Sequence, residues 1–415
     1  VSTQSTGPLA GFTVVEACQM VAGPMAASIC ADLGAEVIKV EAPNGGDRMR
    51  YVGHRVGGIG ALWAGVNRGK RDVVIDLQQP EGAELLRRLV TRADVFIQNF
   101  RPGVAGRLGI DEPALRAVNP DLVYVSINGF GDTGPYSRQK SYDYVIQALS
   151  GMAALQRDSS TGAPSLLRNI VIDKVTAHTA AQSIIAALLA RARGMGGQHV
   201  RLSMIDTALA FLWPDGMMQH TLLDPSVDDG GRVATGPHLT AEYLVRPTAD
   251  GHIVVLATSE RQFPGLCRTL GTEHWLDDPR FATLAAREDN DEVLQEMISV
   301  EVARWTGRAL LDALHVNDIP CSLITPVDEV HLDPQVIHNE VLIEHERPWI
   351  GRVREPRPPA IYSATPTALG RHAPKLDEHT DEVLAELGLA PSDIADLRAR
   401  NVIGPRRSNS RSEER

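Results

Sequence analysis

The sequence predicts an α/β protein: a large Rossmann-like domain with a mostly parallel sheet, and a smaller α+β domain. In the first 130 residues, short apolar stretches typical of buried strands alternate with helix-like stretches, which is the pattern of a parallel sheet covered by helices. The chain has 415 residues, of which 43% are hydrophobic and 22% charged. This length and this composition indicate two or three globular domains.

Apolar runs, and the residues that interrupt them, predict the individual elements. Strands are expected at 12–15, 36–40, 73–77, 95–98, 123–127 and 199–203. Helices are expected at 25–33, from Pro80, at 173–193 and from about Ile205; glycine ends the first helix at Gly34 and the third at Gly194. In the long helix, the apolar residues Ile184, Ile185, Leu188 and Leu189 are expected on one face.

The chain divides into four expected parts. Residues 1–224 form the large domain, and a linker rich in Asp and Gly lies between 224 and 236. Residues 225–330 form the small domain, which begins with a hairpin at 243–257 that turns at Ala249–Gly251. Residues 331–405 return to the large domain, and 406–415 form a disordered polar tail.

Charge narrows the class of partner. The net charge is −11, from 41 basic and 52 acidic residues, which argues against nucleic acid or an anionic membrane as the main partner. Residues 1–110 are nevertheless net positive by two, so a small polyanion, if one binds, is expected there rather than in the rest of the chain. A basic patch, Asn67–Arg71 with Arg101 and Arg107, is either such a binding surface or ordinary solvated surface.

The cysteines and the hydropathy pattern indicate the compartment. Four cysteines occur without a C-x-x-C pair, and no histidine cluster has metal-binding spacing, so a reducing compartment without structural zinc is expected. The first residues contain no apolar signal core, and no apolar run reaches the roughly 18 residues of a membrane span. We therefore expect a cytoplasmic protein.

Gly129, Gly131 and Gly134 match the dinucleotide-binding pattern G-x-G-x-x-G after a strand. The residues that follow, Pro135 to Lys140, are irregular and polar, whereas the fingerprint requires a helix whose amide end faces the pyrophosphate. A mobile glycine-rich loop is favoured over a nicotinamide-dependent dehydrogenase. The sequence also lacks G-x-S-x-G, a Walker loop and H-E-x-x-H, so the corresponding hydrolases and P-loop enzymes lose support.

Asp173 follows an apolar run and opens the long helix. Aspartate is common there simply as an N-cap. The same helix-end amides would also keep a carboxylate ionised, and an ionised carboxylate can act as a nucleophile. The residues alone leave both interpretations open.

Motifs in fixed order along nearly the whole chain resemble class III CoA-transferases and the related α-methylacyl-CoA racemases. They are Pro8–Gly11, Ala22–Pro24, Asp32–Glu41, Gly45–Arg50, Asn67–Arg71, Asp76 with Pro80–Gly82, Ala93–Val95, Asn99–Gly103, Gly129–Pro135, Gly194–His199 and Glu378–Thr380. The resemblance implies an interlocked ring-like homodimer, an acyl-CoA and a small carboxylic acid as substrates, and no metal or permanently bound cofactor.

The resemblance also implies site residues. The family's catalytic aspartate falls on Asp173, which would form aspartyl mixed-anhydride and aspartyl-CoA thioester intermediates. The positions matched to CoA contacts are Val21, Ala22, Ile75, Asp76, Leu77, Gln78, Asn99, Phe100, Arg101, Arg107, Lys140, Ser141, Tyr142 and Asp143.

Differences from particular members of the family bear on function. Ala42 replaces an arginine and Gln78 a lysine of formyl-CoA transferase, and the tetraglycine loop of that enzyme is missing. Tyr142 stands where racemases have a histidine base, and tyrosine, with a pKa near 10, is a poor base at neutral pH. CoA transfer is therefore favoured over racemisation of a 2-methylacyl-CoA. A relative that binds CoA without turnover stays a second alternative.

Overall fold

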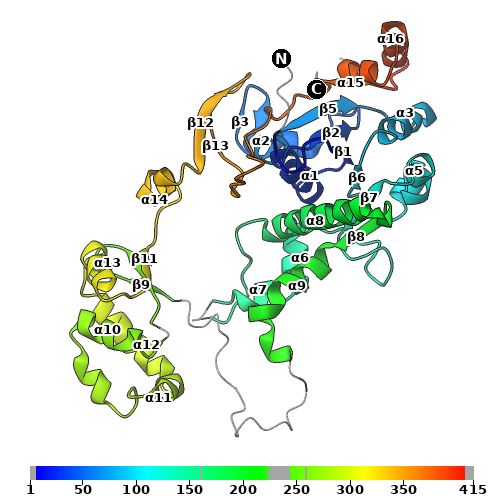
Figure 1. Ribbon diagram of the computed structural model, residues 1–415. Helices are drawn as coiled ribbons and strands as arrows, with labels where there is room; N and C mark the ends of the chain where they lie inside the picture. Colours follow the sequence, from blue (N-terminus) through cyan, green and yellow to red (C-terminus); the bar gives the residue numbers. More distant parts are fainter. Residues whose placement is uncertain (1–5, 159–160, 222, 224–243, 258, 407–415) are drawn as a thin grey trace, which may run out of the picture. The chain divides into compact units, whose positions relative to one another are not determined.

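A computed structural model of the chain describes residues 6–158, 161–221, 223, 244–257 and 259–406 (Figure 1). The chain divides into two compact units: unit 1 comprises Val1–Leu212 with Asn339–Arg415, and unit 2 comprises Trp213–His338. The expected linker within 224–236, the expected boundary at 224/225 and residues 407–415 of the expected tail lie outside the described residues.

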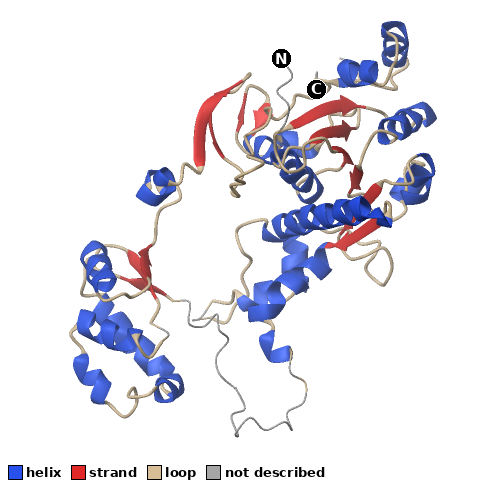
Figure 2. Cartoon of the chain, viewed as in Figure 1, coloured by secondary structure: helices blue, strands red, loops and turns tan. Residues whose placement is uncertain are grey.

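Unit 1 is built on a six-stranded sheet whose neighbouring strands all run parallel (Figure 2). From edge to edge the strands are β5 (Lys70–Val74), β2 (Glu36–Glu41), β1 (Thr13–Ala17), β6 (Val95–Gln98), β7 (Val123–Asn128) and β8 (His199–Ser203). This is the strand order of a Rossmann-like sheet, so the α/β prediction is confirmed. The order reverses between β1 and β6, where such sheets bind ligands beyond the carboxyl ends of the strands.

Successive side chains of the strands feed two separate cores, because they point to opposite faces of the sheet. Val15 packs in a core with α3 (Pro80–Val90), α5 (Glu112–Val118), α15 (Thr380–Glu386) and α16 (Pro391–Ala399). Val14 packs in the other core with α1 (Ala22–Asp32) and α8 (Val171–Ala190). Helices therefore cover both faces, and the loops at the carboxyl ends of the strands remain available for a site.

The long helix differs from its expected form. It begins at Val171 rather than Asp173 and continues after Ala190 as a π-helical turn, Arg191–Met195. The expectation of a single apolar face is wrong, since Ile184 and Leu188 are buried whereas Ile185 and Leu189 are exposed. Residues four apart stack on one stripe of a helix, but adjacent residues lie about 100° apart, so the four residues form two stripes.

The C-terminal part of unit 1 contains a two-stranded ribbon, β12 (Leu342–Arg347) with β13 (Gly351–Pro356), and then α15 and α16. The start of α15 is bonded to β5: the His379 backbone N–H donates to the carbonyl oxygen of Asp72, and the Val74 N–H donates to Thr380 Oγ1 at 2.9 Å. After α16, Ile403 forms an antiparallel bridge with Ile75. The end of the described chain thus lies beside the carboxyl end of β5.

Unit 2 contains an antiparallel sheet of β9 (Val245–Pro247), β10 (His252–Val255) and β11 (Cys321–Leu323). Its helices are α10 (Gln262–Leu270), α11 (Leu284–Asp289), α12 (Asp291–Val302) and α13 (Gly307–Val316), which share an apolar core with the sheet. The strands β9 and β10 form the hairpin expected around Ala249–Gly251.

The remaining elements are short apart from α9. They are η1 (Arg48–Tyr51), β3 (Arg55–Val56), β4 (Ile59–Gly60), α2 (Ala61–Asn67), α4 (Val104–Arg107), α6 (Asp143–Leu149), α7 (Met152–Leu155), α9 (Met204–Gly216), η3 (Met218–His220), η5 (Glu273–Asp277), η6 (Val330–Leu332) and α14 (Pro334–His338). Within the described ranges, no helix is both long and apolar enough to cross a membrane.

Candidate active site

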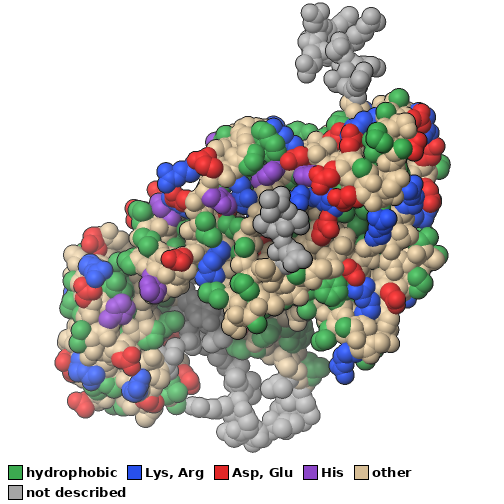
Figure 3. All heavy atoms as spheres, turned by 45° about the horizontal axis from the view of Figure 1, so that its top comes forward, with side chains coloured by type: hydrophobic (Ala, Val, Ile, Leu, Met, Phe, Trp, Pro, Cys, Tyr) green, Lys and Arg blue, Asp and Glu red, His purple; other side chains and the backbone are tan. Residues whose placement is uncertain are grey.

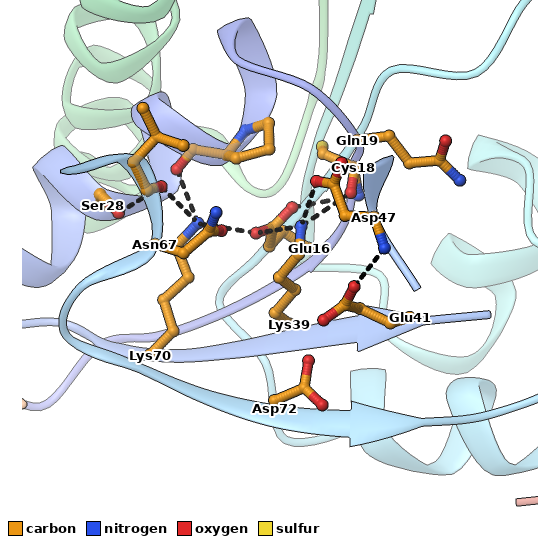
Figure 4. Close-up of polar contacts among 12 residues, drawn as sticks. Glu16, Cys18, Gln19, Ser28, Lys39, Glu41, Asp47, Asn67, Lys70 and Asp72 are labelled. Carbon is orange, nitrogen blue, oxygen red and sulfur yellow. Dashed lines mark hydrogen bonds and ion pairs between the residues drawn. The ribbon is translucent and has the colours of Figure 1, made fainter. Parts of the chain in front are cut away.

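The loop between β1 and α1 and the first turn of α1 together form residues 18–24, called here the loop 18–24. This segment lies where the strand order reverses, and two buried lysines hold its ends. Lys39 Nζ donates to the carbonyl oxygen of Cys18 at 2.8 Å, and Lys70 Nζ donates to that of Pro24 at 2.7 Å (Figure 4). Both lysine side chains are fully buried. The ends of the loop are therefore fixed from inside the fold.

The middle of this loop is held by two further side chains. Asn99 Oδ1 accepts the Gln19 backbone N–H at 2.9 Å, and Asn99 Nδ2 donates to the Gln19 carbonyl at 2.7 Å. Asp47 accepts the Met20 backbone N–H at 3.1 Å. Met20 has a φ of 68°, which is uncommon for a residue other than glycine. These bonds stabilise one conformation of the loop despite that backbone strain.

The two buried lysines share one acid. Glu16 Oε1 lies 3.2 Å from Lys39 Nζ and 2.8 Å from Lys70 Nζ, and Asn67 Oδ1 also accepts from Lys70 at 2.8 Å (Figure 4). Burial alone would raise the pKa of Glu16, but the two ammonium groups outweigh it and hold that pKa below its usual range. Burial lowers the pKa of Lys70 to about 8, against the attraction of Glu16. This network supports the fold rather than a ligand, because each of its charged groups is paired with another buried group of the protein.

The basic run 67–71 belongs to the same interior. Arg68 pairs with Asp32 at 2.6 Å, and Arg71 pairs with Glu386 at 2.8 Å. Both guanidinium groups are largely buried. For these two arginines, the expected binding surface and the alternative of a solvated surface are therefore both wrong.

Asp173 lies in the first turn of α8 and does not cap it. The N-cap residue is Ile170, which makes no side-chain capping bond, so the N-cap interpretation of Asp173 is wrong. The backbone N–H of Ala22, held by the buried lysines, instead lies close enough to the Asp173 carboxylate to favour its ionised form. The nucleophile interpretation thus acquires a defined geometry.

Asp143, the first residue of α6, fixes the start of α8. Its Oδ2 accepts the backbone N–H of Asp173 at 2.9 Å, and its Oδ1 accepts from Gln147 Nε2 at 2.5 Å. Gln147 also donates to the Asn169 carbonyl at 3.1 Å and accepts the Leu167 N–H at 3.0 Å. Together, Asp143 and Gln147 position the segment that carries Asp173.

The surroundings of Asp173 give it an unusual acidity. Burial, and secondarily the negative charge of Asp143, raise the pKa of Asp173 to about 7, although the Ala22 N–H opposes the rise. A carboxylate with so high a pKa is more basic, and hence more nucleophilic, than an aspartate in water. A perturbed acid of this kind is typical of a catalytic site.

A cleft lies at the carboxyl ends of β1, β2, β5 and β6. Its described lining is Ala17, Cys18, Gln19, Val40, Glu41, Ala42, Pro43, Asn44, Gly46, Asp47, Ile75, Asp76, Leu77, Gln78, Phe100, Val104, Leu108 and Arg406. Two of its acids are bonded inward: Glu41 pairs with Arg50, and Asp47 lies 3.4 Å from Lys39. The negative charges of Glu41 and Asp47 are therefore partnered inside the fold.

The residues matched to CoA contacts fall into several groups. Those that line the cleft are Ile75, Asp76, Leu77, Gln78 and Phe100. Those that are buried are Val21, Ala22 and Asp143; those that are exposed are Arg101, Arg107, Lys140 and Tyr142; and those of intermediate exposure are Asn99 and Ser141. Their contacts with CoA stay predictions.

The glycine-rich motif is not a dinucleotide fingerprint. The strand before it ends at Asn128, and the next helix begins only at Asp143, so the fingerprint's phosphate-facing helix is missing here. A Cβ at Gly129 would collide with the side chain of Ser141. Gly129 is required by this close approach, which brings the loop beside the residues that precede α6.

Sequence reasoning missed two supporting residues, Lys39 and Gln147. Lys39 stands in an otherwise apolar strand, between Ile38 and Val40, and a charge in a buried strand is itself a signal of an internal ion pair. For Gln147 no such signal exists, because a helical glutamine is ordinarily exposed.

Comparison with known proteins decides the family. The model of "CoA-transferase family III" matches residues 9–380. The chain belongs to CoA-transferase family III. It is 37% identical to the succinate–glutarate CoA-transferase of Agrobacterium fabrum, over 92% of this chain and 96% of that protein. It is 32% identical to the succinyl-CoA–D-citramalate CoA-transferase of Chloroflexus aurantiacus, over 95% and 98%.

Solved structures agree. A crystal structure of a CAIB/BAIF family protein from Brucella suis matches with a TM-score of 0.78 at 33% identity, covering 92% of this chain and all of that one. The family resemblance is confirmed, and this family III CoA-transferase is an enzyme that moves CoA between acyl-CoA and carboxylic acids.

Proposed function

We propose that Asp173 is the nucleophile of a CoA transfer that proceeds through covalent aspartyl intermediates. The observation that carries the proposal is the carboxylate of Asp173, which is half-buried, lies near the Ala22 N–H and has a pKa raised to about 7. It stands in a rigid frame made of the loop 18–24 and the Asp143–Gln147 pair. A basic carboxylate held in one place is what attack on a thioester requires.

The reaction proceeds in four exchanges. An Asp173 oxygen attacks the carbonyl carbon of the donor thioester, and the C–S bond breaks to give a mixed anhydride and CoA thiolate. The thiolate attacks Cγ of Asp173, and the donor acid leaves with the bridging oxygen. The acceptor carboxylate then attacks the aspartyl thioester, which releases thiolate and forms a second anhydride. Attack of the thiolate on the acceptor carbonyl forms acceptor-CoA and regenerates Asp173.

The protein has to supply orientation and a dry site. Precise placement of the reacting groups can contribute about 7–11 kcal/mol. The hydrogen bond that the Asp173 backbone N–H donates to Asp143 fixes the segment that carries the nucleophile. Water would hydrolyse the anhydrides. The glycine-rich loop at 129–134, which lies against Ser141, is suited to cover the site.

The proposed substrates are dicarboxylic acids with four or five carbons and their CoA thioesters. The two relatives named above act, by their names, on succinate, glutarate, succinyl-CoA and citramalate. Succinyl-CoA with glutarate is therefore the first pair to assay, and a series of mono- and dicarboxylic acceptors would define the range.

Trapping tests the nucleophile. Incubation with succinyl-CoA and then hydroxylamine is expected to convert Asp173 to a hydroxamate, found by peptide mass spectrometry. Asp173→Ala should abolish both the label and transfer while the far-UV circular dichroism stays unchanged. Asp393 is a matched control, since it is also the third residue of its helix, α16, but is exposed. Asp393→Ala should transfer normally, and a label on another peptide would refute the proposal.

The racemase alternative is tested by the α-proton. The Tyr142 side chain is exposed at the start of α6, and its phenol is a weak base. We expect no deuterium exchange at C2 of a 2-methylacyl-CoA in the absence of an acceptor acid. Exchange seen by NMR would favour racemisation.

The proposal extends to a homodimer. Helices α6, α8 and α9 carry exposed apolar side chains, namely Val145, Leu149, Ile185, Leu189 and Phe211. A helix that is apolar on all sides is normally covered, and a second copy of this chain would cover these. Sedimentation should show a dimer that Leu189→Glu weakens. The interlocked ring form stays a prediction from the resemblance.

A further inference from the structure

The cleft at the carboxyl ends of β1, β2, β5 and β6 contains one basic side chain among its described lining residues, Arg406. Two basic groups that flank the lining residues in sequence are paired with acids, Lys39 with Glu16 and Arg50 with Glu41. Arg48, Arg101 and Arg107 also flank lining residues, and they are exposed. On the face shown in Figure 3, basic side chains are interspersed with acidic ones. A phosphate group entering this cleft would meet Arg406 as the basic side chain of its described lining.

The backbone of Arg406 is fixed at the cleft edge. The Asp76 N–H donates to the Val402 carbonyl at 2.8 Å, and the Gly404 N–H donates to the Val74 carbonyl at 3.0 Å. The Arg406 N–H itself donates to the Pro43 carbonyl at 3.0 Å. The end of the described chain therefore lies between the loops that follow β2 and β5. The expectation that Arg406 belongs to a disordered tail is wrong.

The side chain of Arg406 is oriented by a buried acid. Arg406 Nη2 lies 2.8 Å from Asp76 Oδ2, and the Asp76 side chain is only 4% exposed whereas that of Arg406 is 49% exposed. Asp76 also accepts the Gln78 backbone N–H and Gln79 Nε2, each at 3.1 Å. A guanidinium has five donors in a planar fork, so anchoring through one edge is compatible with binding an oxyanion through another.

Arg406 lies beside two positions that lack a cation. Ala42 precedes the residue whose carbonyl holds the Arg406 backbone, and the Gln78 N–H shares the Asp76 carboxylate with the Arg406 side chain. Both Ala42 and Gln78 line the cleft. Neither of these side chains carries a charge, so Arg406 is the cation that the described lining places beside them.

From this geometry we infer that Arg406 binds a phosphate group of the CoA nucleotide. The inference rests on the proposed function, because it takes acyl-CoA as the ligand of the cleft. Asp76 positions Arg406, and it also reduces the cost of holding a cation in the empty cleft.

The test compares acyl-CoA substrates that differ in phosphate content. In Arg406→Gln, KM for succinyl-CoA should rise about tenfold or more while kcat changes little, as expected for loss of a charged hydrogen bond. With succinyl-pantetheine, which has no nucleotide, the variant and the parent should have the same KM. If the variant and the parent have the same KM for the succinyl thioester of 3′-dephospho-CoA, Arg406 binds the 3′-phosphate. If their KM values still differ, Arg406 binds the diphosphate.

Two further variants control for folding and for charge in general. Arg400, on the same C-terminal segment, pairs with Glu81 and Asp396 and does not line the cleft, so Arg400→Gln should leave KM unchanged. Adding Ala42→Arg to Arg406→Gln should lower KM again. An unchanged KM in Arg406→Gln, or an equal rise with succinyl-pantetheine, overturns the inference.

The failure of the inference can be told from failure of the proposed function. Calorimetric titration with free CoA needs no turnover, and Arg406→Gln should weaken CoA binding about tenfold. A parent protein that binds CoA but transfers nothing would contradict the proposed function alone. Equal CoA affinity in parent and variant would contradict the inference alone.

Discussion

Glu16 and Asp173 are both carboxylates withdrawn from water in unit 1, and they differ in what faces them. Glu16 lies against two ammonium groups, those of Lys39 and Lys70, and its pKa is held below the usual range despite complete burial. Asp173 faces another acid, Asp143, and burial together with that charge raises its pKa to about 7. Burial alone therefore does not decide the state of an acid, because the sign of its neighbours does.

The two carboxylates are joined by the loop 18–24. Lys39 and Lys70, which neutralise Glu16, also hold the carbonyl groups of Cys18 and Pro24. Between these two points the loop presents the Ala22 N–H to Asp173. The fully paired charges thus build the frame, and the acid without a cation is the group left for chemistry.

Removing a cationic partner of Glu16 should have the largest effect on stability. Lys70→Met leaves Glu16 fully buried with one cation fewer, and loss of one partner of a buried ion pair costs about 3–5 kcal/mol. Chemical denaturation followed by circular dichroism measures the free energy of unfolding. Lys140→Met, at an exposed lysine, is the control and should change stability little.

The double variant distinguishes charge from packing. Adding Glu16→Gln to Lys70→Met removes the stranded charge and should recover part of the loss. If Lys70→Met were as stable as Lys140→Met, the network would not be the support described here.

Replacing Asp173, the acid that faces no cation, should raise the stability of the protein rather than lower it. Asp173→Asn abolishes transfer but removes an acid that the fold keeps from ionising, so it should stabilise the protein at pH 8 by about 1–3 kcal/mol. The sign follows from the pKa: it is raised to about 7 in the folded state, above the ordinary aspartate value. The wild-type penalty is absent below about pH 4, grows as the pH rises, and is complete above about 7.

Denaturation of both proteins at several pH values checks this trade-off. The gain in Asp173→Asn should shrink toward zero as the pH falls from 8 to about 4. A gain independent of pH would mean that ionisation of Asp173 is not its source.

The sheet could be predicted because its signals are local. Strands 95–98 and 199–203 are found at the expected residues, and Pro80 opens α3 as expected. Apolar periodicity and helix punctuation depend on near neighbours in sequence, so a single sequence contains them. The family motifs then predict Asp173 as the catalytic residue.

The pairing of charges could not be predicted in the same way. Arg71 finds Glu386 more than 300 residues away, and Asp76 finds Arg406 at a similar separation. From the composition, the run 67–71 is expected at the surface and Arg406 in a disordered tail. Net charge gives the number of cations in the chain but not which of them are paired with acids. The structure reverses both assignments: Arg68 and Arg71 are internal, and Arg406 reaches the cleft.

The smallest expected effect comes from changing the neighbour of Asp173 rather than Asp173 itself. Asp143→Asn removes the negative charge that raises the pKa of Asp173, so that pKa should fall by up to about one unit. The amide oxygen can still accept the Asp173 backbone N–H, which keeps the start of α8 in place.

In the parent, kcat/KM should fall as Asp173 is protonated below about pH 7. In Asp143→Asn the same fall should occur at lower pH, with a modest loss at the plateau because a less basic carboxylate is a weaker nucleophile. An unshifted profile would show that Asp143 only positions Asp173, and a shift to higher pH would contradict the electrostatic account of this site.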